Sequence, residues 1–206
     1  MGFTGSAATP RPMRADARRN HDRLLAVAKV AFAERGAEAS LDDIARQAGV
    51  GPGTLYRHFP TRLALLEAVY RDDVSALTAR ADELQRTHPP AQALAEWLQA
   101  FVGYAVGKRG LAAALREILG DRKNSFFLEC SRELRAAAGR LLDRAQQAGA
   151  ARADAQVTDL LRLVHGIVLA TEQGGDDTGQ ADRLLTVVLD GLRPPPGPPA
   201  AKTSGQ

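Results

Sequence analysis

Apolar residues recur along this chain at intervals of three and four, the spacing that places them on one face of an α-helix. Leu24, Ala28 and Phe32 form the first such stripe, and Gly36 supplies a stop behind it. The sequence shows neither the alternation of β-strands nor an internal repeat. It therefore predicts an all-α protein of about nine helices, in which a small N-terminal unit of three helices precedes a larger helical body.

Composition sets the boundaries of these parts. Residues 1–15 are small, polar and proline-containing, and residues 194–206 are proline-rich, so both are predicted to be disordered, the first as a basic arm. Residues 16–62 and 63–193 then form two folded domains. Helices of the second domain are expected from Thr61 to the THPP segment, and near residues 91–106, 110–119, 124–148, 154–173 and 179–192.

Two short helices are predicted one after the other between residues 40 and 59. Ser40 is a good N-cap for the first helix, and Gly49 ends it. Pro52 suits the first position of the second helix, which Pro60 limits to barely two turns. Two helices joined by a glycine turn in this way make a helix-turn-helix, whose second helix enters the major groove of DNA.

The second of these helices is held by few residues and exposes the rest. Leu55 and Phe59 are four apart and share the inward face, whereas Arg57 points the other way. The alternative interpretation is a short structural helix with a solvated polar face. The first three residues of the helix, Pro52, Gly53 and Thr54, have little bulk. In a DNA groove they would let the backbone approach the bases closely.

Hydrogen-bond donors to phosphate surround this motif. Tyr56, His58 and Arg62 carry such donors in their side chains. Free N–H groups are also expected at the two helix N-termini that Ser40 and Thr61 cap. These groups would position the motif on the duplex without reading its sequence.

Charge is distributed unevenly along the chain. The formal net charge is +3, but residues 1–62 hold 10 Lys and Arg against 6 Asp and Glu. Residues 63–206 hold the other 17 basic residues against 18 acidic ones. A basic segment on a near-neutral body favours a polyanionic partner such as nucleic acid. The competing hypothesis is a helical interaction module whose basic head binds acidic proteins or nucleic acid without sequence preference.

Several classes of protein are disfavoured by what the 206 residues contain. The single cysteine, Cys130, rules out an intrachain disulfide and fits a cytoplasmic protein, and no apolar run is long enough to span a membrane. The motifs GxSxG and HExxH and any cysteine pair are missing, so we predict no enzyme, metal or cofactor. The adjacent acids Asp72 and Asp73 are expected to be solvated.

The segment from Arg18 to about Val74 resembles the DNA-binding domain of the TetR family of transcriptional regulators. The segments KRGLAAAL, FFLECSREL and LLRLVHGIVLA are similar to one branch of the family's C-terminal bodies, the SbtR-like domains. The residues that carry the first resemblance are Leu24, Leu25, Ala28, Phe32, Gly36, Ile44, Ala45, Ala48 to Val50, Gly53 to Tyr56, His58, Phe59, Leu65 and Leu66.

The resemblance implies a homodimer that binds a near-palindromic, double-stranded operator. A ligand in the C-terminal domain would shift the fourth helix and move the two reading heads apart. Gly51 departs from the pattern, because a Ser or Thr often caps the third helix there. The positions that match the family's phosphate contacts are Ser40, Thr54, Tyr56, His58 and Arg62, and those nearest the bases are Pro52, Gly53, Thr54 and Arg57.

Direct base readout looks sparse for such a helix, because two of the residues nearest the bases are proline and glycine. Arg57 is one candidate to compensate. The N-terminal arm, in a minor groove, is the other. The arm's basic residues are Arg11, Arg14, Arg18 and Arg19.

Aromatic residues in the body suggest a ligand pocket. Trp97, Phe101 and Tyr104 are spaced i, i+4 and i+7, and Phe127 could join them. Tyr104 and Cys130 are the polar candidates in such a pocket for a small-molecule effector. The alternative interpretation is that these residues form an ordinary core.

The last two predicted helices, near 154–173 and 179–192, carry apolar residues on much of their surface. A single chain of this size could not cover them all. We therefore predict that they form the four-helix dimer interface that the family resemblance implies.

Overall fold

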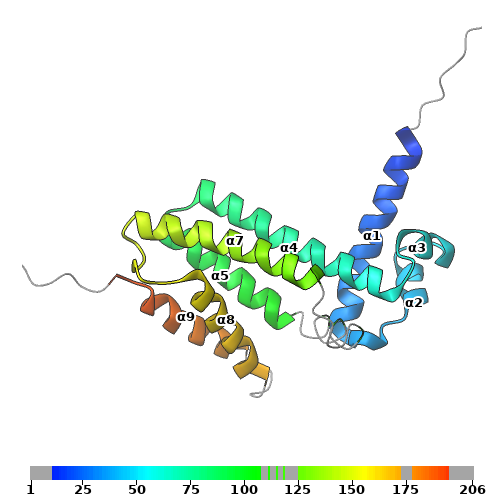
Figure 1. The fold of residues 1–206 in the computed structure, drawn as a ribbon. Coiled ribbons are helices and arrows are strands. Elements are labelled where there is room, and N and C mark those ends of the chain that lie inside the picture. The colour runs from blue at the N-terminus through cyan, green and yellow to red at the C-terminus, as the bar shows by residue number, and fades with distance from the viewer. Residues whose placement is uncertain are drawn as a thin grey trace, which may run out of the picture. The chain divides into compact units, whose positions relative to one another are not determined.

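The computed structural model describes residues 11–107, 111, 115, 118, 125–172 and 178–194, and these residues are helical or connect helices, with no strand among them. The all-α prediction is confirmed (Figure 1). The predicted helix at 110–119 and the tail beyond Pro194 lie largely outside the described residues. The helices are α1 (Arg11–Arg35), α2 (Leu41–Gln47), α3 (Pro52–His58), α4 (Arg62–Thr87), α5 (Pro90–Gly107), α7 (Ser125–Gln147), α8 (Val157–Glu172) and α9 (Thr178–Gly191), with a 3-10 turn at Gly36–Glu38.

Helix α1 starts earlier than the sequence predicted. Residues 11–15, which we assigned to a disordered arm, form its first turn and a half. Proline at position 12 is compatible with this, since the first turn of a helix does not need its N–H. Met, Arg and Ala follow, all good helix formers, and Asp16 pairs with Arg19 one turn later.

The described residues divide into two compact units, and the boundary falls inside α4, after Asp73. The first unit holds residues 11–73 together with the described part of 107–126. The predicted boundary at residue 62 differs because the start of α4 belongs to the core of this unit: Leu65, Leu66 and Val69 are fully buried. Fully buried residues on the other helices of the unit are Leu24, Ala28, Phe32, Ala45 and Leu55.

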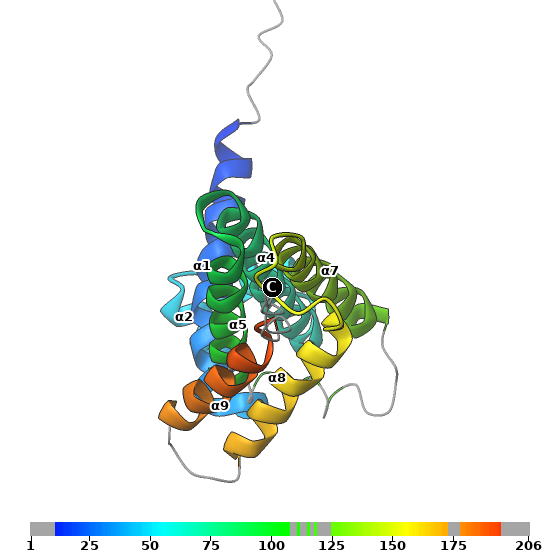
Figure 2. The ribbon, with the colours of Figure 1, turned by 90° about the vertical axis from the view of Figure 1, so that its left-hand side faces the viewer.

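The second unit contains residues 74–106 and 127–194. In it α5 and α7 are tied to the second half of α4, and α8 packs against α9 (Figure 2). The indole Nε1 of Trp97 donates to the carbonyl oxygen of Leu77 at 2.9 Å, joining α5 to α4. The Arg140 guanidinium pairs with Asp82 at 2.8 Å, joining α7 to α4.

Candidate nucleic-acid interface

The turn between α2 and α3 is set by its capping residues. Ser40 Oγ accepts a hydrogen bond from the N–H of Asp43 at 3.2 Å and so caps α2, as the sequence predicted. Gly49 then adopts a left-handed conformation, with φ of 68°, which a residue with a side chain rarely adopts. Pro52 begins α3. The two helices contact each other, and α1 contacts α2.

Helix α3 is anchored by the two residues that the sequence assigned to its inward face. Leu55 is fully buried and Phe59, just past the end of the helix, is nearly so. Burying a side chain of this size contributes about 1.5 to 3 kcal/mol. Two such anchors attach the short helix to the unit while leaving its outward face uncovered.

The outward face of α3 is open and has few side chains. Gly51, Pro52 and Gly53 are exposed, and a Cβ built on either glycine meets nothing within 4 Å. Tyr56 is exposed, and Arg57 is exposed without an internal partner among the described residues. Within the described part of the chain, Arg57 and the two glycines on this face therefore take no part in packing.

Other predicted DNA contacts take part in packing inside the unit. The ring of His58 is half-buried and lies edge-on to the ring of His21 on α1, with centroids 5.9 Å apart. Thr54 is also half-buried. Arg62 Nη1 donates to the carbonyl oxygen of Ala39 at 2.6 Å, joining the start of α4 to the residue before Ser40. Arg62 thus positions two helix N-termini as well as carrying charge.

The remaining predicted contacts lie at the edges of the motif. Thr61 Oγ1 accepts from the N–H of Ala64 at 3.1 Å and caps α4, as predicted. Arg18 is exposed in the N-terminal part of α1, so it belongs to a helix and not to a flexible arm. Its neighbour Arg19 is engaged with Asp16.

The predicted effector residues form a row of rings in the second unit. The rings of Trp97 and Phe101 stack with centroids 5.3 Å apart, and those of Phe101 and Tyr104 with centroids 6.5 Å apart. Trp97 and Cys130 are fully buried, whereas Phe101, Tyr104 and Phe127 are half-buried. Part of the proposed pocket lining is therefore core.

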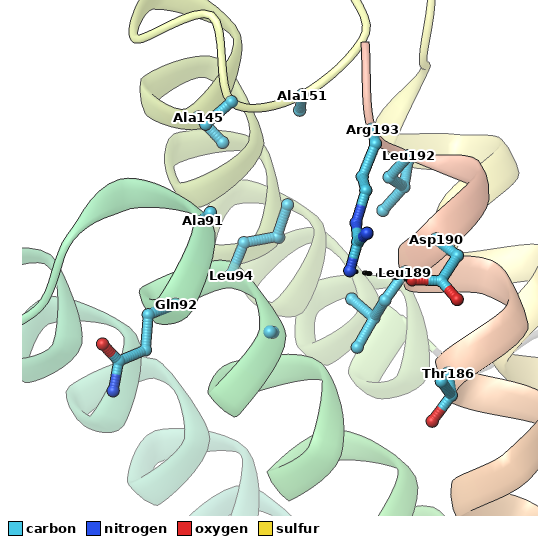
Figure 3. A pocket seen from close by; sticks show the side chains of 12 residues that line it. Ala91, Gln92, Leu94, Ala145, Ala151, Thr186, Leu189, Asp190, Leu192 and Arg193 are labelled. Carbon is cyan, nitrogen blue, oxygen red and sulfur yellow. Dashed lines mark ion pairs between the residues drawn. The ribbon is translucent and has the colours of Figure 1, made fainter. Parts of the chain in front are cut away.

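Two hollows lie elsewhere in the second unit, and none of the five predicted effector residues lines either of them. One is a crevice of about 350 Å³ where α5 begins and α9 ends; at its rim Arg193 turns back to Asp190 at 3.0 Å (Figure 3). The other is an apolar groove of about 590 Å³ between α8 and α9. It is lined by Asp159, Arg162, Leu163, Gly166, Ile167, Ala170, Leu184, Val187 and Val188.

Sequence reasoning missed one cluster. Asp72 and Asp73 are not simply solvated, because both contact Lys29 and Asp73 is buried. The signal was available: Lys29 follows Leu25 by four positions, and Asp73 follows Leu66 by seven, so each charge lies on an apolar stripe. A second pair of adjacent acids in the sequence, at residues 176–177, lies outside the described residues.

Within the described ranges, no three His, Cys, Asp or Glu side chains gather closely enough to hold a metal ion. None of the helices described is both long and apolar enough to cross a membrane.

The anchored two-helix motif and its uncovered second helix define a helix-turn-helix DNA-binding protein with a helical body. Residues 24–69 match the family model described as bacterial regulatory proteins of the tetR family, and residues 89–194 match that of the SbtR-like transcriptional regulator C-terminal domain. The chain belongs to the TetR family of DNA-binding transcriptional regulators.

Relatives of this chain agree with the assignment. The crystal structure of the TetR regulator SCO0520 from Streptomyces coelicolor is 43% identical, with a TM-score of 0.76, over 85% of this chain and 99% of that one. A TetR regulator from Mycobacterium vanbaalenii is 36% identical, with a TM-score of 0.72, over 88% and 99%. The repressor KstR2 of Rhodococcus jostii is 26% identical over 84% of this chain and 90% of its own.

Proposed function

We propose that the protein is a cytoplasmic, homodimeric repressor that binds a near-palindromic operator and is released from it by a small, mostly apolar ligand. The observation that carries this proposal is the outward face of α3. The face is open and offers its backbone at two exposed glycines, and its Arg57 has no internal partner among the residues that the structure describes. Side chains this small at the N-terminal end of the face suit close approach to a DNA groove.

The contacts are proposed in two groups. Pro52, Gly53, Thr54 and Arg57 would lie nearest the bases. The phosphates would be held by Ser40, Tyr56, His58 and Arg62, and by Arg18 in the N-terminal part of α1. Gly51 would leave room for the backbone at the N-terminus of α3, where a larger residue would stand between the helix and the duplex.

A second copy of the chain is the proposed partner on the α8–α9 face. Leu163 is 54% exposed and Val187 is 69% exposed on either side of the apolar groove. Gly166 and Ala170 also line it, and such small residues allow two helices to approach closely. A two-fold dimer presents two α3 helices to two half-sites, which is why the operator would be palindromic.

Repression and ligand release are supported more indirectly. KstR2 bears the name of a repressor, and the body matches the SbtR-like C-terminal model. The effector would bind beside the row of Trp97, Phe101 and Tyr104, with Phe127 and Cys130 close by. The three half-buried side chains, Phe101, Tyr104 and Phe127, are the ones that a ligand would reach first.

The experiment is fluorescence anisotropy of the full chain on DNA flanking its own gene and on scrambled DNA, over a series of salt concentrations. We expect preference for the flanking DNA of about a thousandfold, at two protomers per site. Arg57→Ala should weaken this binding by about 1 to 3 kcal/mol. Arg132→Ala is the matched control, since Arg132 is an exposed arginine of α7 without an internal partner among the described residues.

If the protein binds both DNAs with equal affinity, and that affinity falls steeply with salt, the flanking DNA does not contain the proposed operator. Selection from random DNA would then decide between a distant operator and a protein that binds nucleic acid without preference.

A further inference from the structure

A single turn of α4 contacts its neighbours on two sides. On one side Lys29 Nζ, from α1, lies 2.6 Å from Asp72 Oδ2 and 2.6 Å from Asp73 Oδ1. On the other side the ring of Phe126, in the first turn of α7, lies edge-on to Tyr70 with centroids 5.7 Å apart. The guanidinium carbon of Arg71 is 5.1 Å from the centre of the same Phe126 ring. All these residues belong to the first compact unit.

The ionic contact is unusual in being largely enclosed. The side chain of Asp73 is 9% exposed and that of Lys29 is 25% exposed, whereas that of Asp72 is 50% exposed. Asp73 is the one charged residue that is buried among those described. Burial lowers the pKa of Lys29, but its hydrogen bonds to the two carboxylates and their charges outweigh this and raise the pKa above its ordinary value.

A buried ion pair is a poor way to gain stability, because desolvation cancels much of its attraction and an apolar pair would often serve as well. Its specific contribution is geometric, since two charges at 2.6 Å tolerate little rotation or sliding of the helices that carry them. Helix α1, in turn, contacts α2, and α2 contacts the reading helix α3. A change in the angle of α1 on α4 would therefore reach α3 through α2.

We propose that Lys29 is a positioning residue for operator binding: through Asp73, and less through Asp72, it fixes α1 on α4 and so holds α3 in the orientation that two half-sites require. Lys29 is not a DNA contact in this scheme. The inference rests on the proposed function. It adds a residue outside the helix-turn-helix on which sequence-specific binding depends and non-specific binding does not.

The test compares wild-type full chain with Lys29→Met, Lys29→Arg, Asp73→Asn and Asp72→Asn, on the flanking DNA and on scrambled DNA. Lys29→Met and Asp73→Asn should weaken binding to the flanking DNA about tenfold or more, while binding to scrambled DNA changes about twofold at most. Lys29→Arg should restore operator affinity to within a few-fold of wild type. Asp72→Asn should have the smallest effect, because that carboxylate is half exposed.

The outcomes separate the two proposals. If wild type does not prefer the flanking DNA or any DNA selected from a random pool, the proposed function fails and this inference fails with it. If wild type does prefer such DNA but Lys29→Met and Asp73→Asn bind it equally well, only the positioning role is wrong. Equal losses on both DNAs, or failure of both variants to fold by circular dichroism, would mean a purely structural ion pair and would also overturn the role.

Discussion

The two units of this protein place their candidate functional residues in opposite ways. In the first unit the outward face of α3 bears almost no packing: its glycines face open space, and Arg57 has no internal partner among the described residues. In the second unit the candidate effector residues include the fully buried Trp97 and Cys130. The outward face of α3 is thus free of packing, unlike Thr54, His58 and Arg62 beside it, whereas in the second unit the buried candidates would have to serve both the core and a ligand.

This difference decides what substitution can show in each unit. A change on the outward face of α3 should alter binding without lowering stability. A change in the aromatic row should alter stability first, so that loss of a ligand response there would be ambiguous by itself. The half-buried members of the row, Phe101 and Tyr104, are the better probes of an effector than Trp97.

The largest effect is expected for Trp97→Ala. The substitution empties a fully buried site and removes the donor to the Leu77 carbonyl, which should lower the free energy of unfolding by about 3 to 5 kcal/mol. Urea denaturation followed by circular dichroism measures this value. Tyr56→Ala on α3 is the counterpart, with an expected change within about 0.5 kcal/mol. Similar losses in both variants would remove the contrast between the units.

A charge on the proposed dimer face is expected to have the next largest effect. Leu163→Glu would place an unpaired carboxylate in an apolar interface and weaken dimerisation by about 2 kcal/mol or more. Sedimentation equilibrium gives the dissociation constant. Leu128→Glu is the matched control, because Leu128 is 58% exposed on α7 and does not line the α8–α9 groove. An unchanged constant for Leu163→Glu would locate any dimer interface elsewhere.

Gly53→Ala should separate stability from binding by changing them in opposite directions. Its φ is not positive and a Cβ there meets open space, so alanine should stabilise α3 by about 1 kcal/mol in the free protein. On DNA the added methyl group would stand between the backbone and the groove. We expect a higher melting temperature together with weaker operator binding. Tighter or unchanged binding would indicate that this glycine is not kept for DNA.

The helix boundaries and anchors of the first unit could be predicted from the sequence because the signals for them are local. Caps, breakers and apolar spacing lie within a few residues of what they control, so Ser40, Gly49 and Leu55 could each be assigned correctly. The start of α1 was missed because a proline was taken as a sign of disorder, although it lies in the first helical turn, where proline is tolerated.

Longer-range features could not be assigned in the same way. Arg62 was predicted as a phosphate contact, but its bond to Ala39 joins residues 23 positions apart. Which rings of the body become core and which line a hollow depends on packing between helices, and no spacing along one helix reports it. The Lys29–Asp73 pair could be predicted only in part. Opposite charges on two apolar stripes suggest an ion pair, but the sequence does not show which stripes meet.

The smallest predicted effect concerns that pair and the pH dependence of stability. The pKa of Lys29 is raised in the folded protein, so the folded state holds this proton more tightly than the unfolded chain. The contribution should be complete below the ordinary lysine pKa and be lost as the pH rises through the higher folded value. As the pH rises above the ordinary lysine pKa of about 10.4, the free energy of unfolding measured in urea should therefore fall by a few tenths of a kcal/mol more for wild type than for Lys29→Met. Parallel curves for the two proteins would mean that the Lys29 ammonium is not held by Asp73 in solution, and would remove the physical basis for its role in positioning α1 on α4.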